Sequence, residues 1–512
     1  MLDCVFAQRE GRVLIMKKVI AFLCAATLVL SLCGCRGTAE EYSTVSWVEG
    51  SENNNTTTSQ NGDASDNVSS SENYADTGNQ KIDNPLNVDL KGATILIYDT
   101  GAVFKPDSSF SKTEKARAEL LNKLQKELNC KFKVVVATSE QIKANVTNSA
   151  ASGKALCGII APNMYESGYY IAANLVTNLT RVSSMDLSKN YMNRYGVLNA
   201  SQFGKAKYAV AAEGESRPQI VYFNKRILKE LGFSESYIYD LVDNGEWTYD
   251  VYRDLAKKAM KDLDGKPGMS SEDQWGQVIQ DDTTAVMSNI LISYGAPMLS
   301  LSSSGELQNN MTNPNIMQAI NLSKSIFVTD GTKYTCSTVD DKLKFFEQGK
   351  ALFCYASIGK AMYIADMKDE FGVAPAPQVA NTKNYISAND YNCRVLMIPA
   401  GLSAKDQYNA GAVIQAYQYL YKNVLDAMEK EYTNRYLRDV ESAKNWRLAA
   451  DIMTTMPQQL YAQTNEAILS GTYRVFWDYY SDKEASPASK IESTKSSLNK
   501  ALEELNKNIK DK

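Results

Sequence analysis

The sequence predicts an α/β fold with a helix-rich C-terminal part. Apolar, strand-like segments at residues 93–98, 131–136 and 156–160 alternate with helical patterns at residues 111–129 and 139–151. Strands alternating with helices in this way are typical of a parallel sheet with crossover helices. A chain of 512 residues that is 44% hydrophobic and 22% charged allows two or three domains with a large core.

The rest of the chain continues this alternation and then becomes mainly helical. Beyond Ser403, apolar residues such as Leu420 and Tyr421 recur at the spacing of a buried helix face. We expect strands at residues 275–279, 351–355, 372–374 and 394–399, and helices at residues 224–231, 234–243, 248–262, 283–294, 314–329, 339–348, 410–424 and 487–509.

A lipoprotein export signal is predicted at the N-terminus. Met16 is followed by two lysines, by an apolar run over residues 19–32 that is too short to span a bilayer, and by a Leu-Cys-Gly-Cys sequence ending at Cys35. We expect residues 1–35 to be the signal peptide, with its true start at Met16 and lipid attached to Cys35. Cys33 is the competing acceptor, and an uncleaved anchor or an ordinary secretory peptide is the alternative.

The segment that follows, residues 36–84, is predicted to be a disordered polar tether. It consists mainly of Ser, Thr, Asn, Asp, Gly and Glu and has almost nothing to bury. Such a composition cannot offset the entropy lost on ordering. Signal and tether together predict an extracytoplasmic globule, anchored by lipid to the cell membrane at the cell surface or the periplasmic face.

The composition excludes several kinds of chemistry. The 55 basic and 59 acidic residues give a net charge of -4, which argues against a nucleic acid partner. The chain contains no histidine, which excludes Ser-His-Asp and Cys-His catalysis and imidazole metal sites. It also lacks the glycine motifs that bind phosphates or dinucleotides, so no cofactor is expected.

Neither the cysteines nor an acidic loop at residues 262–273 predicts a metal. Five cysteines fall in the globular part, widely spaced and without a Cys-x-x-Cys pair, so buried thiols are expected. With Gly265 at the sixth position of a calcium loop, Met260 takes the first position and Ser271 the twelfth, where acidic ligands are required. We therefore expect a solvated turn and no metal.

Five segments, in this order, resemble one protein family. The first, Ile220 to Phe233, reads Ile-Val-Tyr-Phe-Asn-Lys-Arg-Ile-Leu-Lys-Glu-Leu-Gly-Phe. The others are Gly-Glu-Trp-Thr-Tyr-Asp at 245–250, the acidic loop leading to Trp-Gly at 262–276, Phe-Phe-Glu-Gln-Gly-Lys-Ala-Leu-Phe at 345–353 and Phe-Gly-Val-Ala-Pro-Ala-Pro at 371–377. They resemble the family 1 extracellular solute-binding proteins of bacterial ABC importers, the maltose-binding, carbohydrate type.

This resemblance covers about residue 93 to the C-terminus. It departs from the family near Gly153, where the usual Gly-x-x-x-x-Asp pattern ends in Gly158 and puts the first-lobe ligand contacts in doubt. It implies a two-lobed periplasmic-binding-protein-like fold with a hinge, in which ligand is trapped in the cleft. Lobe 1 would hold about 85–212 and 390–440, and lobe 2 about 222–380 and 450–512. The lobes would be joined at residues 208–222, at 377–393 and around Trp446.

The function that the resemblance implies is the capture of a mono- or oligosaccharide for delivery to an ABC permease. No reaction and no catalytic residues are expected, and the chain is expected to be a monomer. Hinge closure would couple binding of the solute to a shape that the permease can recognise.

Ligand contacts are expected at aromatic and polar residues near predicted strand ends and loop tips. Sugars are held by aromatic rings and by side-chain hydrogen bonds to their hydroxyl groups. Most of the 30 tyrosines are core or surface residues, and Trp247 is better explained as a packing residue before a helix. The candidates are Tyr98, Asn163, Tyr165, Trp275, Asp281, Asp282, Tyr294, Tyr355, Asp390, Tyr391 and Trp477.

Three alternatives remain open at this stage. The same fold can bind a peptide, a polyamine or a sugar acid, and the acidic Asp281, Asp282 and Asp390 would suit a cation. A glycosidase would have to rest on a pair of carboxylates, since no histidine is present. A surface sensor or adhesin would use the same fold with different partners.

Overall fold

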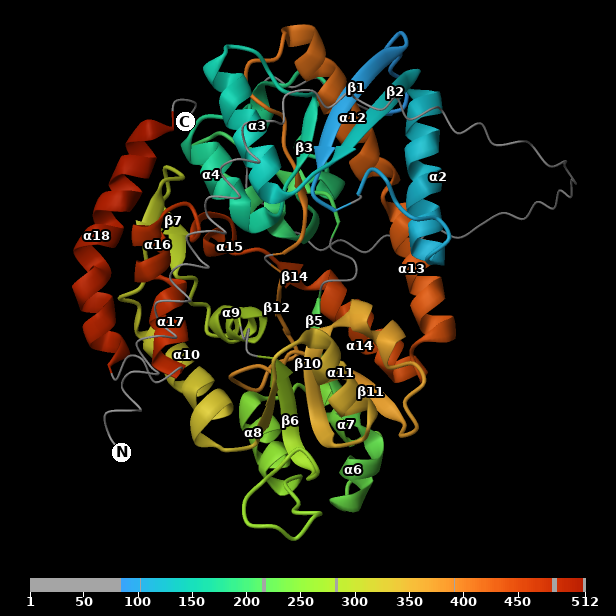
Figure 1. Cartoon of the computed structure of the whole chain (residues 1–512), viewed down its shortest axis with the longest axis vertical. Coiled ribbons are helices and arrows are strands. Elements are labelled where there is room, and N and C mark those ends of the chain that lie inside the picture. The colour runs from blue at the N-terminus through green and yellow to red at the C-terminus, as the bar shows by residue number, and fades with distance from the viewer. Residues whose placement is uncertain are drawn as a thin grey trace, which may run out of the picture. The chain divides into compact units, whose positions relative to one another are not determined.

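The computed structural model describes residues 84–101, 103–213, 218–280, 284–390, 392–480 and 486–509, which belong to one compact unit. The predicted signal peptide, its acceptor Cys35 and the tether up to residue 83 lie outside them. None of the helices in the described ranges is long and apolar enough to cross a membrane. The α/β class is confirmed, with two separate larger sheets and a C-terminal part made almost entirely of helices (Figure 1).

Lobe 1, at the top of Figure 1, is built on a parallel sheet with the strand order β2-β1-β3. Its elements are β1 (Ala93–Asp99), α2 (Lys112–Glu127), β2 (Cys130–Val136), α3 (Ser139–Ala151) and β3 (Ile159–Ala161). Ser111 and Thr138 begin the two helices, because each side chain accepts a hydrogen bond from a first-turn amide. The alternation predicted for this region is confirmed, and the carboxyl ends of the three strands meet at one edge of the sheet.

Lobe 2 contains a five-stranded mixed sheet with the order β11-β5-β10-β6-β9. Its strands are β5 (Gln219–Asn224), β6 (Trp275–Gln280), β9 (Lys333–Cys336), β10 (Ala351–Ser357) and β11 (Phe371–Pro375). Its helices are α6 (Lys225–Glu230), α7 (Tyr237–Asn244), α8 (Tyr249–Lys258) and α11 (Val339–Glu347). β6 runs parallel to β9 and β10, whereas β5 is antiparallel to both of its neighbours. β5 and β9 were not predicted from the sequence, because both are short strands beside stronger helical patterns.

As far as residue 451, three segments of chain connect the lobes. The first follows β4 (Val210–Ala211), and the second joins β11 to β12 (Ser387–Ala388) and β13 (Val395–Leu396), which pairs with β4. The third runs through α12 (Ala404–Leu420), α13 (Lys422–Arg435) and α14 (Val440–Asp451). α12 and α13 pack on α2 of lobe 1, and α14 packs on β11 of lobe 2. This crossing therefore falls on α13 and not around Trp446, which is buried in lobe 2 against Tyr432.

The remaining elements fill the space around the two sheets. In lobe 1 these are η1 (Met164–Glu166), α4 (Ser167–Ala172), η2 (Leu179–Arg181), η3 (Asn190–Gly196) and α5 (Val197–Ala200). Those after β6 are α9 (Thr284–Ser293), β7 (Leu299–Leu301), β8 (Leu307–Asn309), α10 (Pro314–Lys324), the π-helical η4 (Ser325–Thr329) and η5 (Ile358–Tyr363). The C-terminal ones are β14 (Met453–Thr454), α15 (Pro457–Tyr461), α16 (Glu466–Gly471), α17 (Tyr473–Tyr480) and α18 (Pro487–Asn508).

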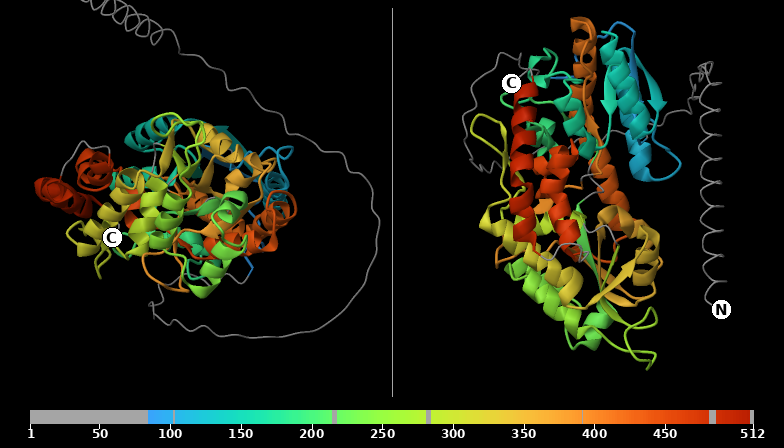
Figure 2. Two further views of the ribbon diagram at one scale, coloured as in Figure 1. Left: turned by 90° about the horizontal axis from the view of Figure 1, so that it is seen from below. Right: turned by 60° about the vertical axis from the view of Figure 1, so that its left-hand side comes forward.

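The C-terminal helices lie along one side of both lobes, beside the β7–β8 hairpin (Figure 2). α15 packs on α4 and η1 of lobe 1, whereas α17 and α18 pack on α10, so residues 450–512 do not stay with lobe 2 alone. On this side the main chain of Gly204 in lobe 1 donates to the carbonyl oxygen of Gly305 at the hairpin tip, at 2.9 Å. A Cβ on Gly305, which has a φ of +79°, would overlap that part of Gly204.

All five cysteines of the described residues are free and buried, as the sequence predicts. Burial raises the pKa of the thiols of Cys130 and Cys354 to about 11 and that of Cys157 to about 12. Cys130 belongs to a core cluster of lobe 1 and Cys336 and Cys354 to one of lobe 2, whereas Cys157 belongs to a cluster that includes residues of both lobes.

Candidate functional site

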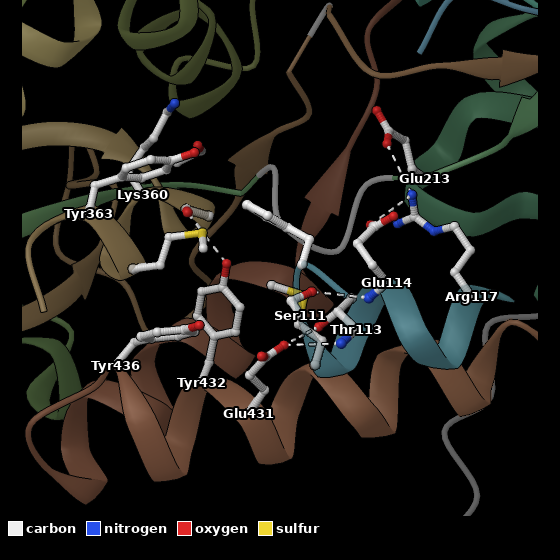
Figure 3. Close-up of a pocket in the computed structure, with 15 residues that line it drawn as sticks. Ser111, Thr113, Glu114, Arg117, Glu213, Lys360, Tyr363, Glu431, Tyr432 and Tyr436 are labelled. Carbon is white, nitrogen blue, oxygen red and sulfur yellow. Dashed lines mark hydrogen bonds and ion pairs between the residues drawn. The ribbon is translucent and has the colours of Figure 1, made fainter. Parts of the chain in front are cut away.

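A cavity of about 210 Å³ lies between the two lobes, beside the crossing helix α13 (Figure 3). One wall is the start of α2 and the loop before it, in lobe 1. The opposite wall is the segment after β10, in lobe 2, from Ser357 to Tyr363. One face of α13 forms the third side, and Glu213 from the first crossing completes the lining. The cavity thus touches both lobes and two of the three segments that connect them.

The carboxylate of Glu431 on α13 is bonded to the first turn of α2. It accepts hydrogen bonds from the backbone amides of Lys112 and Thr113, both at 3.0 Å, and from the hydroxyl of Thr113 at 2.8 Å. A carboxylate at this position satisfies helix amides that have no partner within the helix and interacts favourably with the helix dipole. Because Glu431 is only 2% exposed, this contact fixes the wall of the cavity to its floor.

A network of ion pairs lies at the end of the cavity nearest the first crossing. Arg117 contacts Glu114 at 3.3 Å and Glu213 at 3.9 Å, and Glu213 in turn accepts a hydrogen bond from Arg394 at 2.7 Å. Arg117 and Glu213 are both buried. Behind them, burial raises the pKa of Asp99 even though its carboxylate accepts hydrogen bonds from the amides of Gly101 and Phe104.

The aromatic residues of the cavity fall into two groups. Tyr432 and Tyr436 from α13 are 6% and 5% exposed and form part of the floor. Phe110 and Tyr363 also line the cavity, yet 57% and 53% of their surface is exposed. Lys360 lies beside Tyr363, with its amine 5.0 Å from the centre of that ring. The site therefore combines charged and hydroxyl groups with aromatic faces, which is the combination that small-ligand sites use.

None of the candidates within the described residues lines this cavity, but four of them lie at the carboxyl edge of the lobe 1 sheet. Tyr98 is the last residue but one of β1, and the Asn163 amide donates to the hydroxyl of Tyr165 at 3.4 Å. Asn163 also pairs with Arg394, the residue that holds Glu213. The amide of Cys393 donates to the carbonyl oxygen of Asp390, the fourth of these candidates.

The other described candidates lie elsewhere in the fold. Tyr355 is 4% exposed in the core of lobe 2, where burial raises its pKa, and Trp275 begins β6 and donates to the carbonyl oxygen of Ser270. Tyr294 follows α9, and the Trp477 indole of α17 donates to the hydroxyl of Thr284 at 3.2 Å. The candidates Asp281, Asp282 and Tyr391 lie outside the described residues.

Some of the residues that line the cavity, although not predicted, lie at or near positions that the sequence analysis marked. Glu213 lies within the predicted first crossing, where any polar side chain is placed between two lobes. The predicted strand over residues 351–355 ends at Tyr355, and the lining begins only two residues further on, at Ser357. Glu431 gave no signal, because its role depends on a contact with a helix that is more than 300 residues earlier in the chain.

The acidic loop at residues 262–273, considered above as a calcium loop, brings three carboxylates together. One oxygen each of Asp262, Asp264 and Asp273 lies within 4.8 Å of the others. The carboxylate of Asp273, however, already accepts from the amides of Leu263 and Ser270, at 2.8 and 2.7 Å. These bonds shape the turn, and the loop lies before β6, away from the cavity.

No protein-family model and no curated protein sequence matches the chain. By structure it is similar to an ABC transporter protein from Bifidobacterium longum in complex with lacto-N-biose, with a TM-score of 0.56 and 12% identity over 81% of this chain and 98% of that one. It is also similar to an ABC substrate-binding protein from Listeria monocytogenes in complex with cycloalternan, with a TM-score of 0.54 and 12% identity over 81% of this chain and 100% of that one. A Mycobacterium tuberculosis protein in complex with glycerophosphocholine gives a TM-score of 0.51 and 16% identity over 80% and 98%.

These likenesses show the fold. The chain has the two-lobed architecture of the solute-binding proteins of ABC transporters, as the sequence predicted.

Proposed function

We propose that this protein captures a carbohydrate between its lobes and delivers it to an ABC permease. The observation that carries the proposal is the cavity, which touches both lobes and the crossing helix and combines ion-paired polar groups with aromatic rings. A ligand held there contacts both lobes at once, so its binding free energy favours the closed arrangement over an open one. The sugars bound by two of the similar proteins support this ligand class.

The charges in the cavity favour a neutral sugar over a sugar acid or a polyamine. Glu431 already occupies the start of α2, where helix amides would otherwise attract an anion. Glu213 is paired with Arg394, and Glu114 with Arg117. Because these carboxylates have partners inside the protein, a cationic solute could bind one of them only by displacing its partner. A hydroxyl group can bond to a paired carboxylate without displacing its partner, because it carries no charge and both donates and accepts.

The test is isothermal titration calorimetry of the whole protein against mono- and oligosaccharides, with spermidine, a tripeptide, glucuronate and glycerophosphocholine as the other ligand classes. We expect a sugar to bind with an affinity that changes little between low and high salt. Glu114→Gln should weaken that binding, whereas Glu119→Gln, an exposed position on the same helix, should not. Binding of only a charged solute, with a strong salt dependence, would overturn the carbohydrate assignment.

We also propose that the protein is lipid-anchored through Cys35 outside the cytoplasm. The support is the signal-like sequence before it, together with an extracytoplasmic role for the fold. Cys35→Ser should move the protein from the membrane fraction into the medium, and Cys33→Ser should leave it in place. Release by Cys33→Ser alone would assign the anchor to Cys33.

A hydrolytic function is the enzyme alternative. Hydrolysis of a glycosidic bond needs one carboxyl group that donates a proton to the leaving oxygen. It also needs a second carboxylate on the other side of the bond that acts as the nucleophile or the general base. Since Glu213 is bonded to an arginine and Glu431 to the start of a helix, both are engaged in other contacts. Release of new reducing ends from an oligosaccharide that binds would contradict the assignment as a transport protein.

A further inference from the structure

The ionic residues are divided unevenly between the two lobes. Residues 84–212 of lobe 1 contain 16 lysines and arginines against 9 aspartates and glutamates, whereas residues 218–380 of lobe 2 contain 15 against 21. The helices α12 and α13, which pack on α2 of lobe 1, contain four of each kind. Lobe 1 is therefore basic although the whole chain has a net charge of -4. Such an asymmetry orients a molecule beside a charged surface.

Part of this positive charge lies together at the outer edge of lobe 1. β2 is an edge strand of its sheet, and the end of α2 lies beside β2, because the amide of Phe132 donates to the side-chain oxygen of Gln125 at 2.8 Å. Both elements lie on the side of the molecule away from α18 (Figure 1). The exposed lysines that they carry here, which we call the basic edge, are Lys123, Lys126, Lys131 and Lys133.

The lysines of the basic edge are available to an external charge. All four are exposed, and none of them forms an ion pair with another described residue. Lysines at a helix end and on an edge strand also have structural roles, since they complement the helix dipole and deter pairing with another sheet. Those roles account for single lysines but not for the excess of positive charge over the whole lobe.

The chain enters lobe 1 at the same edge. The amides of Leu90 and Gly92 donate to the carbonyl oxygens of Leu128 and Asn129, directly after α2, both at 2.8 Å. The 48 residues from 36 to 83, which follow the proposed lipid site, therefore lead to the basic edge. An unfolded chain of this length spans about 40 Å on average. A lipid anchor would thus keep this edge of lobe 1 close to the bilayer.

We propose that the basic edge docks on the anionic headgroups of the membrane that carries the lipid anchor. This inference rests on the proposed anchor and not on the choice of solute. Each lysine is attracted to an anionic lipid surface within about 10 Å, which is the Debye length at about 0.1 M salt. The anchor raises the local concentration of headgroups, so a weak attraction is enough to orient the globule. Lobe 2, which is acidic, is turned away from the membrane.

The first experiment measures binding to vesicles in the absence of the lipid anchor. It uses the chain from Arg36 onward, which contains all of the described residues, with vesicles of phosphatidylcholine alone or mixed with phosphatidylglycerol. At low salt we expect binding to the anionic vesicles that is at least about 10-fold stronger than to the neutral ones. The difference should disappear at about 1 M salt, where the Debye length is about 3 Å.

Two triple variants with the same change in net charge locate the binding surface. The first combines Lys126→Gln, Lys131→Gln and Lys133→Gln. The control replaces three exposed lysines outside lobe 1 that likewise form no ion pair with a described residue, by Lys344→Gln, Lys368→Gln and Lys383→Gln. The first variant should bind anionic vesicles at least about 10-fold more weakly than wild type, and the control less than about 3-fold. Equal weakening by both would show an effect of net charge alone and would overturn the proposal.

Lysine acetylation followed by peptide mass spectrometry maps the contact directly. On anionic vesicles the four lysines of the basic edge should be acetylated at least about 3-fold more slowly than in solution, because headgroups cover them. The three control lysines should react at the same rate in both. Protection of the control lysines instead would place the membrane on another face and contradict the proposal.

The competing occupant of the basic edge is the segment at residues 36–83, which contains nine acidic and two basic residues. A variant with these nine carboxylates changed to amides distinguishes the two. If anionic vesicles bind this variant but not the wild type, the segment occupies the edge and the lipid assignment is wrong. Failure of both to bind would also overturn it. In either case carbohydrate binding and the fractionation of Cys35→Ser would still test the proposed function.

Discussion

The contact between Glu431 and the start of α2 leads to a prediction for stability and for local motion. Glu431→Ala removes the acceptor of three hydrogen bonds, at 3.0, 3.0 and 2.8 Å, from a place that is 2% exposed. Loss of a helix cap costs about 0.5–2 kcal/mol, and a buried hydroxyl without a partner, here that of Thr113, costs about 1–3 kcal/mol. We therefore expect the free energy of unfolding to fall by about 2–4 kcal/mol.

Two measurements check this value. The entropy of unfolding grows with chain length, so in a protein of this size each kcal/mol lost from the free energy of unfolding lowers the melting temperature by about 1 °C. Calorimetry should therefore show a melting temperature lower by about 2–4 °C. Hydrogen exchange resolves the place of the change: the amides of Lys112 and Thr113 should exchange at least about 10-fold faster, because each loses a bond to a charged acceptor. The rest of the lobe 1 sheet should keep its protection.

The control is Glu429→Ala, two residues away on the same helix. The side chain of Glu429 is 43% exposed and pairs with Arg447 on α14, so its loss should change stability by less than about 1 kcal/mol. Equal melting temperatures for the two variants, or unchanged exchange of Lys112 and Thr113 in Glu431→Ala, would refute the cap.

Three further predictions follow from contacts in and between the lobes. Burial opposes ionisation of Asp439, but the 2.7 Å bond from Lys225, the amide of Ser442 and the hydroxyl of Tyr239 together outweigh it and lower the pKa. The stability that these contacts add is therefore present above the usual pKa near 3.8 and lost as the pH falls through the lowered value. The stability gap between wild type and Asp439→Asn in urea melts should therefore close at acidic pH. Gly305→Ala should lower the melting temperature, because the new methyl group meets Gly204. Trp247→Ala, at a fully buried site, should cost about 3–5 kcal/mol.

Each of these variants has a matched control in the same protein. Asp243→Asn removes an exposed partner of Lys444 and should change stability by less than about 1 kcal/mol. Gly331→Ala introduces a side chain at a similar positive φ of +65° but in open space, so it isolates backbone strain from the clash. Trp275→Ala removes a half-buried indole and should cost less than Trp247→Ala. Equal effects within any pair would show that the contact named for it is unimportant.

The sequence predicted the fold better than the site, for a physical reason. Strand and helix patterns are local, so the alternation from Ala93 to Ile160 and the final helix could be read from periodicity alone. The start of α8 was predicted at residue 248, and Thr248 caps it, whereas α12 begins after Ser403, six residues before the predicted start at residue 410. The third crossing was misplaced because α13 differs from its neighbours only in what it packs against.

The cavity could not be found in this way because its residues come from four distant parts of the chain. With 30 tyrosines, an aromatic residue near a strand end has little power to discriminate. Tyr355 met that criterion and lies in the core of lobe 2, whereas Tyr363, eight residues later on a short helix, met none and lines the cavity. The partners of Arg117 and Glu213 depend on the meeting of two lobes, which periodicity does not encode.

Buried thiols in each lobe make it possible to measure how often that lobe opens. The thiolate is the form that reacts with alkylating reagents. Burial hides all five groups and raises the pKa of Cys130, Cys157 and Cys354. The rate of alkylation at Cys130 therefore reports how often lobe 1 opens, and the rate at Cys336 and Cys354 reports the same for lobe 2. Peptide mass spectrometry separates the two rates in one sample, without any change to the sequence. A solute that ties the lobes together should slow both.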